Sequence, residues 1–297
     1  MTGAPGKRAV LIAGPTASGK SALALKRARE LGGIVVNTDA MQVYDVLRVL
    51  TARPSGAEMG GVPHLLYGAV PPSVRFSTGE WARAAAAVIA EHHGRPLIFA
   101  GGTGLYFEAL TRGLAGVPEV PEAAVREAEE ELKGLDREGR RRLLEARDPA
   151  TAAQLQAHDP QRVARALAVL KTTGRPLASF RSEVPPGLLD GYALERIVLN
   201  PTRELLRERI AGRFEAMLEQ GAVEEVEALM ARGLDPGLPA MKAIGVREIA
   251  DWLAGRATRE EAVARAVTAT RQYAKRQRTW FRGRMSDWNW IEAGGGT

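Results

Sequence analysis

The sequence predicts an α/β fold, with a parallel sheet flanked by helices and an inserted helical subdomain. Two observations predict it. Apolar runs of strand length alternate with helical patterns through the first hundred residues, which favours a parallel sheet. The first run, 9–13, leads directly into the glycine-rich segment 14–21, which has the spacing of a P-loop. We therefore expect a sheet of the P-loop NTPase-like type.

The P-loop segment is Gly14, Pro15, Thr16, Ala17, Ser18, Gly19, Lys20 and Ser21. Its glycines let backbone N–H groups turn toward phosphate oxygens, Lys20 can reach the terminal phosphates, and the Ser21 hydroxyl can ligate Mg²⁺. Residues 22–28 are predicted to be helical, and a helix N-terminus adds about half a positive charge. A glycine-rich turn without a ligand is the alternative, but the lysine and serine favour a diphosphate or triphosphate.

Composition narrows the class of protein. The 297 residues suffice for one large domain or for a core domain with a smaller one. The formal net charge of +6 favours a polyanionic partner, and the absence of cysteine excludes disulfides and thiolate metal sites. No apolar run approaches about 20 residues, and the N-terminus lacks the apolar region of a signal peptide. We expect a soluble, cytoplasmic protein without a membrane partner.

The second predicted strand, 34–38, ends in Asp39. Ligands of open parallel sheets bind beyond the carboxyl ends of the strands, so Asp39 should lie on the same edge as the P-loop. The carboxylate could be an exposed loop group or a magnesium ligand through water. It could also accept a proton from a nucleophile. A third strand is predicted at 65–70 and a helix at 81–91.

The next predicted strand, 96–100, ends in Gly101-Gly102-Thr103. A motor-type NTPase would place a Walker-B aspartate at the end of such a strand. Its absence favours a transferase, with the Thr103 hydroxyl directed at the ligand. A threonine that caps the following helix explains the spacing equally well.

The composition changes at about residue 113. We expect a core domain of residues 1–112 and 195–297, and a helical insertion of 113–194 that interrupts it. Residues 122–147 are helical in pattern, and Asp159 is a good N-cap for a further helix. The apolar face of that helix leaves Gln161, Arg162 and Arg165 on other faces. A solvated helix face is the ordinary explanation of such charges.

Basic residues mark the C-terminal part of the chain. Arg213 adjoins an apolar helical seam, so it is either a snorkelling arginine or a phosphate ligand. The last long helix carries Arg271, Lys275, Arg278 and Arg282 at i, i+4, i+7 and i+11. This stripe could be the exposed face of a soluble helix. Its density in an already basic chain favours contact with a phosphate backbone.

Seven segments in order resemble the tRNA dimethylallyltransferases: GPTASGKS, TDAMQVY, TARP, FAGGTGLYFEAL, DPQRVARAL, MKAIGVRE and TRQYAKRQRTWFR. The resemblance runs from Val10 to about Trp290. The K-R-Q-x-T-W-F-R run and the P-T-A-S-G-K form of the P-loop are specific to that family, whose members prenylate an adenosine 3′-adjacent to the anticodon.

The resemblance implies how the residues act. The P-loop would bind the pyrophosphate of dimethylallyl diphosphate, and the exocyclic N6 amine of the adenosine would attack the allylic carbon and release pyrophosphate. Asp39 would accept the proton of the amine. Thr103 would hydrogen-bond the leaving oxygen. Mg²⁺ held by Ser21, together with Lys20 and Arg213, would stabilise the charge on the leaving group.

The resemblance also implies a set of tRNA contacts. These are Asp39, Ala40, Met41 and Gln42; Arg126; Gln161, Arg162, Val163, Ala164 and Arg165; and Lys242, Ala243, Ile244, Gly245, Val246 and Arg247. The insertion would clasp the anticodon stem-loop, and the target base would leave the loop stack to reach the site. Arg278 and Arg282 would follow the RNA backbone. We expect a monomer.

Two departures from the family pattern stand beside the catalytic aspartate. Ala40 replaces a common serine, and residues 46–51 read V-L-R-V-L-T where members commonly read G-M-D-I-G-T. Two other functions remain open. A P-loop small-molecule kinase would use ATP and Asp39 but leaves the basic helix and the insertion without a role. A non-catalytic RNA-binding module explains the charge but not the P-loop.

Overall fold

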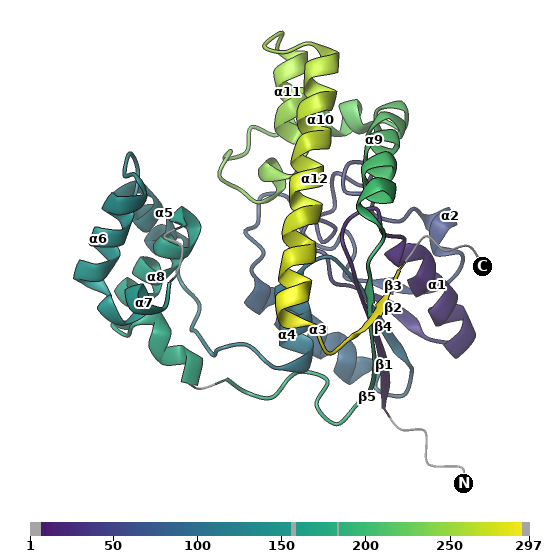
Figure 1. Ribbon diagram of the computed structural model, residues 1–297, viewed down its shortest axis with the longest axis horizontal. Helices are drawn as coiled ribbons and strands as arrows, with labels where there is room; N and C mark the ends of the chain where they lie inside the picture. The colour runs from purple at the N-terminus through teal and green to yellow at the C-terminus, as the bar shows by residue number, and fades with distance from the viewer. Residues whose placement is uncertain (1–6, 156–158, 183, 293–297) are drawn as a thin grey trace. The chain divides into compact units, whose positions relative to one another are not determined.

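The computed structural model describes residues 7–155, 159–182 and 184–292. The chain divides into two compact units (Figure 1). The first consists of Met1–Leu110 and Leu188–Thr297, and the second of Thr111–Gly187. The sequence prediction gives the bounds of the insertion as 113–194. The contacts group residues 188–194 with the first unit, because Leu188 N and Leu189 N donate to the Ala109 and Leu110 carbonyls and β5 pairs with β1 from Ala193.

The first unit contains one parallel sheet with the strand order β3-β2-β4-β1-β5-β6. Its strands are β1 (Arg8–Ala13), β2 (Ile34–Asn37), β3 (His64–Leu65), β4 (Leu97–Gly101), β5 (Ala193–Leu199) and β6 (Asn289–Ile291). The register pairs Ala13 with Gly101 and with Val198. The loops after β1 and β4 therefore leave the sheet side by side, as predicted for ligand-binding loops.

The strand predicted at 65–70 is much shorter than expected. β3 ends at Leu65 because Leu66 adopts a left-handed backbone conformation with φ of +62°, which a continuing strand cannot contain. Further along, Val70 forms only an isolated parallel bridge with Tyr44. The apolar residues after Leu65 therefore belong to a turn and not to a longer edge strand.

Helices cover both faces of the sheet (Figure 1). On one face, α1 (Lys20–Leu31) packs Ala24 and Ala28 against Val10 and Ile12 of β1. On the other face lie α3 (Thr78–Glu91) and α4 (Gly104–Thr111), whose Trp81 and Tyr106 rings stack with centroids 4.0 Å apart. A short helix, α2 (Gly56–Met59), precedes β3. The central strands are consequently buried on both sides, as their continuous apolar runs require.

The remaining helices of the first unit are α9 (Arg203–Glu219), α10 (Ala222–Met230), α11 (Val246–Leu253) and α12 (Arg259–Arg284), with a short 3₁₀ turn at Ala240–Lys242. They share an apolar cluster that includes Leu206, Ile210, Phe214, Val226 and Ile249. Thr202 caps α9 by accepting a hydrogen bond from the backbone N–H of Leu205, as the sequence predicts.

The second unit is helical and has a core of its own. It contains α5 (Glu122–Glu131), α6 (Arg137–Arg147), α7 (Pro149–Gln154), α8 (Pro160–Thr173) and a 3₁₀ turn at Leu177–Ser182. The helical pattern over 122–147 forms two helices because Asp136 caps the second one by accepting a bond from Gly139 N. Asp159 caps α8 as predicted, accepting from the backbone N–H groups of Gln161 and Arg162. Within the described ranges, no helix is both long and apolar enough to cross a membrane.

Candidate active site

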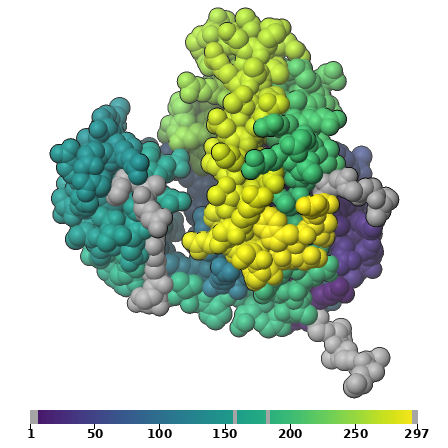
Figure 2. Space-filling model, viewed as in Figure 1, coloured from purple at the N-terminus to yellow at the C-terminus, as the bar shows by residue number. Residues whose placement is uncertain are grey.

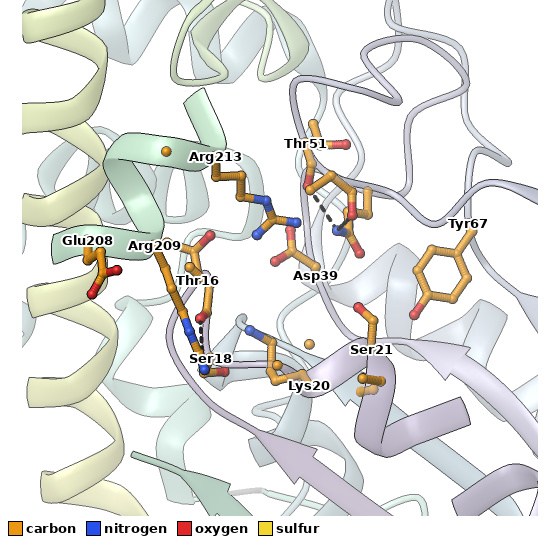
Figure 3. A pocket seen from close by; sticks show the side chains of 18 residues that line it. Thr16, Ser18, Lys20, Ser21, Asp39, Thr51, Tyr67, Glu208, Arg209 and Arg213 are labelled. Carbon is orange, nitrogen blue, oxygen red and sulfur yellow. Dashed lines mark hydrogen bonds between the residues drawn. The ribbon is translucent and has the colours of Figure 1, made fainter. Parts of the chain in front are cut away.

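The P-loop lines a cavity of about 670 Å³ at the carboxyl edge of the sheet (Figure 3). Gly19 adopts φ of +90°, so the chain turns sharply before α1 begins at Lys20. The ammonium group of Lys20 donates a hydrogen bond to the Pro15 carbonyl at 2.7 Å and so lies inside the loop. The Ser21 hydroxyl lines the same cavity. This arrangement matches the cradle that the sequence predicts for a chain of phosphates.

The cavity carries excess positive charge. Burial lowers the pKa of Lys20 from 10.5 to about 8, the nearby Asp39 carboxylate partly opposes this, and Arg213 adds to it. Burial also lowers the pKa of Arg213, while Glu58 and Asp39 oppose that shift. Two partly desolvated cations that face one carboxylate constitute a site for an anion.

Helix α9 supplies Arg213 to this site. Figure 3 shows the guanidinium group of Arg213 reaching toward Asp39 from that helix. One turn earlier, Arg209 lines the cavity and approaches the Ala17 carbonyl at 3.4 Å. The head of Arg213 therefore faces the cavity. Of the two interpretations that the sequence left open, this position favours the phosphate ligand over the snorkelling arginine.

Asp39 is held in place by hydrogen bonds between side chains and backbone groups in the loop after β2. Its N–H donates to Asn37 Oδ1 at 2.8 Å, and Asn37 Nδ2 donates to the Asp39 carbonyl at 2.9 Å. The Oδ1 atom of Asp39 accepts a bond from Met41 N at 3.0 Å. Oδ2 accepts no hydrogen bond from the described part of the chain, and Asp39 lines both cavities. One oxygen thus anchors the carboxylate and the other is available to a ligand.

Thr103 stabilises the Asp39 loop through its side chain, from the position directly before α4, where its carbonyl accepts a bond from Tyr106 N. Its hydroxyl oxygen accepts a hydrogen bond from Ala40 N at 2.9 Å, and its N–H donates to the Thr38 carbonyl at 3.0 Å. The hydroxyl proton remains available as a donor. The backbone N–H of Ala40 makes this bond, so the departure from the family's common serine leaves it intact.

Gln277 of α12 is a site residue that the sequence analysis did not single out. Its side-chain oxygen accepts a bond from Thr16 N, and its side-chain nitrogen donates to the Gly102 carbonyl, both at 2.9 Å. The side chain is 6% exposed. One buried amide therefore connects the P-loop to the loop after β4. The sequence signal was the glutamine within the K-R-Q-x-T-W-F-R run, which the sequence analysis used as a family motif without assigning a role to the glutamine.

The glycines after β4 leave room for these neighbours. A Cβ at Gly102 would collide with Gln277 Nε2 and lie 3.2 Å from Asp39 Oδ2. A Cβ at Gly104 would collide with the indole of Trp280 on α12. The G-G-T-G pattern is therefore explained by close packing of α12 and Asp39 against this loop.

A second cavity, of about 340 Å³, shares Asp39, Thr16, Ala17, Thr51, Ala52 and Arg213 with the first. Its other lining residues include Met41, Phe214 and Met217, which make it more apolar, and Tyr273 of α12. Burial raises the pKa of Tyr273, and the charge of Asp39 adds to this, so its hydroxyl stays protonated. Asp39 thus lies where a polar cavity meets a more apolar one.

The predicted tRNA-contacting residues fall into exposed and buried groups. In the 242–247 segment, Lys242 and Ile244 line the second cavity, Arg247 is exposed 3.9 Å from Asp251, and Ala243 and Val246 are buried. Gly245 has φ of +100° and contributes no side chain. Val246 therefore supports the segment from the core, whereas Ala243, although buried, also lines the second cavity.

In the second unit, too, some of the predicted tRNA-contacting residues are exposed and others are buried. Gln161, Arg162 and Arg165 are exposed on α8, as predicted, whereas Val163 and Ala164 are buried in its core. Arg126 of α5 is exposed and lies 3.9 Å from Glu122. The exposed side chains of α8 are the ones that could meet a large ligand.

The segment that departs from the family pattern is fixed by long-range bonds. The Glu225 carboxylate of α10 accepts hydrogen bonds from Val49 N and Leu50 N at 2.8–3.1 Å. The Gln42 side chain donates to the carbonyls of Thr51 and Ala52 at 2.9 and 3.0 Å. Gln42 thus contributes to the shape of the first cavity and lines it as well.

The residues present fit a magnesium ion only in company with a substrate. Among the described residues, no group of three or more His, Cys, Asp or Glu side chains is placed to hold a metal. The cavity offers the oxygens of Ser21 and Asp39. Mg²⁺ is commonly bound by one or two protein oxygens together with substrate phosphates and water, which this donor set allows.

Comparison with known families decides what kind of protein this is. The model of the IPP transferase family matches residues 42–284, and the isopentenyl transferase model matches residues 7–68. The chain belongs to the IPP transferase family. The match covers most of the first unit and all of the second, which agrees with the resemblance drawn from the seven motifs.

Two relatives match this chain over nearly the whole of both sequences. A tRNA dimethylallyltransferase of Rhizobium etli (strain CIAT 652) is 53% identical over 283 residues, covering 95% of each chain. That of Rhizobium meliloti (strain 1021) is 49% identical over 287 residues, covering 96% of this chain and 95% of the relative.

Solved structures place the IPP transferase chain in the same fold. Full-length tRNA isopentenylpyrophosphate transferase from Bacillus halodurans matches with a TM-score of 0.69 and 34% identity, over 98% of this chain and 91% of its own. A eukaryotic dimethylallyltransferase acting on tRNA matches with a TM-score of 0.81 and 27% identity, over 97% and 74%. The predicted fold class is thereby confirmed.

Proposed function

We propose that this protein transfers a dimethylallyl group from dimethylallyl diphosphate to the N6 amine of the adenosine 3′-adjacent to the anticodon in tRNA. The observation that carries the proposal is the position of Asp39, at the junction of a cationic P-loop cavity and a more apolar one. A proton acceptor between an anion site and a second pocket suits a reaction that joins an amine to the carbon next to a diphosphate.

In this reaction the diphosphate lies in the P-loop cavity. Backbone amides of the loop, Lys20 and Arg213 bind its oxygens and stabilise the negative charge that grows as the carbon–oxygen bond breaks. The Thr103 hydroxyl donates a hydrogen bond to the leaving oxygen and keeps its proton. Ser21, with the diphosphate oxygens, would hold Mg²⁺, which supplies further stabilisation of that charge.

The amine attacks the allylic carbon from the side of the second cavity. A carbon–nitrogen bond forms, the carbon–oxygen bond breaks, and inorganic pyrophosphate leaves with the bonding electron pair. The proton of the amine moves to Asp39 Oδ2, the carboxylate oxygen that accepts no hydrogen bond from the described residues. An aromatic amine is a weak nucleophile, so removal of this proton as the bond forms lowers the barrier.

The RNA side uses residues on both units. Asp39, Ala40 and Met41, with Lys242, Ala243 and Ile244, line the second cavity, and we place the flipped adenine there. Gln42, which lines the first cavity, and Gly245, Val246 and Arg247 complete the two tRNA-contacting segments. Arg126 and the exposed residues of α8 contact the anticodon loop, and Arg278 and Arg282 of α12 contact the backbone. As part of this proposal the protein acts as a monomer in the cytoplasm.

The kinase alternative, with ATP in the P-loop, is not favoured. The names of the relatives describe transferases that act on tRNA, and a kinase leaves the basic residues of α12 without a role. The deciding experiment incubates the purified protein with tRNA transcript, dimethylallyl diphosphate and Mg²⁺, and analyses the nucleosides by mass spectrometry. A parallel reaction contains ATP in place of the prenyl donor.

We expect one dimethylallyl addition on adenosine and one pyrophosphate released per modified tRNA. The matched control is a transcript in which guanosine replaces the target adenosine, which should remain unmodified. ADP formation with ATP, without any prenylated nucleoside in the first reaction, would overturn the proposal in favour of the kinase.

A further inference from the structure

Helices α9 and α12 form a groove of about 530 Å³ that is separate from the two cavities above. Six cationic side chains line it: Arg203 and Arg207 of α9, and Arg271, Lys275, Arg278 and Arg282 of α12. The other lining residues are Leu206, Ile210, Gln272 and Thr279, so the groove contains no carboxylate. In Figure 2 the surface of α12 (yellow) is exposed and adjoins that of α9 (green).

These cations are not neutralised within the protein. In the described part of the chain, none of the six forms an ion pair. Other arginines on the same helix do. Arg259 pairs with Glu215 at 2.6 Å, and Arg284 pairs with Glu108 at 2.9 Å. Burial lowers the pKa of Arg278, the charges of Arg282 and Arg203 lower it further, and Glu204 partly opposes them. Six close, unpaired cations are unfavourable unless an anion joins them.

The two helices use different faces for the groove and for the active site. On α9, the groove takes positions 203, 207 and 210, whereas Arg209 and Arg213 face the P-loop cavity. On α12, Gln277 faces the P-loop and Tyr273 faces the second cavity. Ile210 lines both the groove and the second cavity, so the two are neighbours.

The shape and chemistry of the groove indicate its ligand. From Arg271 to Arg282 the stripe runs eleven residues along a helix, which is about 16 Å. That length suits a row of phosphates better than one compact anion. No aromatic side chain lines the groove, and single-stranded nucleic acids are bound by stacking on aromatic rings. Double-stranded RNA, in contrast, is recognised through its backbone.

We propose that the α9–α12 groove binds the phosphate backbone of a double-stranded tRNA stem, with Arg203 and Arg207 forming a second wall opposite the α12 stripe. The inference rests on the proposed function for the identity of the RNA. It adds a duplex contact, independent of sequence, beside the pocket that receives the target base. The wall on α9 is not part of any segment whose pattern suggested RNA binding.

The test measures equilibrium binding of a labelled anticodon stem-loop between 50 and 200 mM salt, which requires no catalysis. The variant Arg203→Gln/Arg207→Gln should reduce the slope of log K against log salt by up to about 1.8, because each duplex phosphate contact contributes about 0.9. The affinity ratio of wild type to variant should therefore change by about tenfold across this range. Arg278→Gln/Arg282→Gln should behave similarly.

A matched control removes two exposed arginines of the same unit that lie outside the groove, Arg232→Gln/Arg265→Gln. We expect its salt slope to remain that of the wild type. A second comparison uses a single-stranded oligonucleotide with the loop sequence but no stem. Its binding should differ little between wild type and the Arg203→Gln/Arg207→Gln variant.

Three results would overturn the inference. The first is a loss of salt slope in the Arg232→Gln/Arg265→Gln control equal to that in Arg203→Gln/Arg207→Gln. The second is an equal loss when the ligand is the oligonucleotide without a stem. The third is an unchanged salt slope for the stem-loop in Arg203→Gln/Arg207→Gln, together with weaker binding of inorganic tripolyphosphate or anionic vesicles. Failure of the proposed function has a different signature, because the wild type would then bind the stem-loop but transfer no dimethylallyl group to it.

Discussion

The two halves of the catalytic site are built in different ways. The P-loop is a run of eight consecutive residues, shaped by local backbone turns and the bond from Lys20 to Pro15, with one distant bond from Thr16 N to Gln277. The Asp39 carboxylate depends on Asn37, two residues earlier, on Thr103 and, through Gly102 beside Thr103, on Gln277. The proposed diphosphate cradle is therefore mainly a local segment, whereas the position of the proposed proton acceptor depends more on tertiary contacts.

Removal of the proton acceptor should have the largest effect. Asp39→Asn keeps Oδ1 as an acceptor for Met41 N but loses the negative charge, so turnover should fall by roughly 10² to 10⁴. Single-turnover rates, with binding of each substrate measured separately, give the result. Asp45→Asn, on an exposed carboxylate nearby, is the control. If the dominant loss were in affinity for the diphosphate, Asp39 would belong to the anion site instead.

The next largest effect should come from the P-loop itself. Lys20→Ala removes a charge-assisted bond to the diphosphate, worth about 1.5–3 kcal/mol, so the affinity for dimethylallyl diphosphate should fall by roughly 10- to 100-fold. Binding can be followed by calorimetry. Lys26→Ala, exposed on the same helix, should bind normally. An equal loss of tRNA affinity in Lys20→Ala would contradict the local character of this half of the site.

The same lysine predicts a pH dependence. Its pKa in the free protein is about 8, and the diphosphate requires the protonated form. Affinity for the diphosphate should therefore be constant below this value and fall by up to about tenfold per pH unit above it. Titration of the dissociation constant between pH 7 and 10 measures this, and Lys20→Ala should lack the dependence. A midpoint near 10.5 would mean that the lysine is solvated.

Substitutions at Gln277 test the part of the site that depends on residues distant in the sequence. Gln277→Leu leaves the Thr16 N–H and the Gly102 carbonyl unpaired in a buried place, at a cost of about 1–3 kcal/mol in the free energy of unfolding. Gln277→Glu retains the acceptor for Thr16 N, so its affinity for the diphosphate should lie between those of the wild type and of Gln277→Leu. Urea unfolding and the KM for dimethylallyl diphosphate report the two effects. The control Gln272→Leu changes an exposed glutamine on the same helix.

The smallest effect should come from the second unit. Arg162→Gln/Arg165→Gln removes two exposed charges of α8 and should raise the KM for tRNA several-fold at 0.15 M salt, because exposed contacts are screened. The KM for dimethylallyl diphosphate should not change. Arg112→Gln/Arg137→Gln removes two exposed arginines elsewhere in this unit as the control. Equal effects in both variants would indicate general attraction of RNA and no contact at α8.

Local signals in the sequence were sufficient for the P-loop, for the strand that delivers Asp39 and for the caps at Thr202 and Asp159. Each depends on consecutive residues, whose backbone preferences act over one or two turns. The strand expected over 65–70 was too long because its apolar residues fit a turn as well as a strand. The bond that makes Thr103 an anchor for the Asp39 loop joins residues far apart in the chain, and no local pattern reports it.

The sequence by itself determined the P-loop at the carboxyl edge of the sheet, because strand, glycine loop and helix follow one another in consecutive residues. Only the tertiary structure decided which side of α12 faces the P-loop and which side lines the basic groove. Its basic stripe was visible as a spacing of three or four residues, but the roles of the buried Gln277 amide and of the α9 arginines that line the same groove follow only from the packing of the helices. Packing brings together groups that the chain separates, and sequence spacing carries no information about such distances.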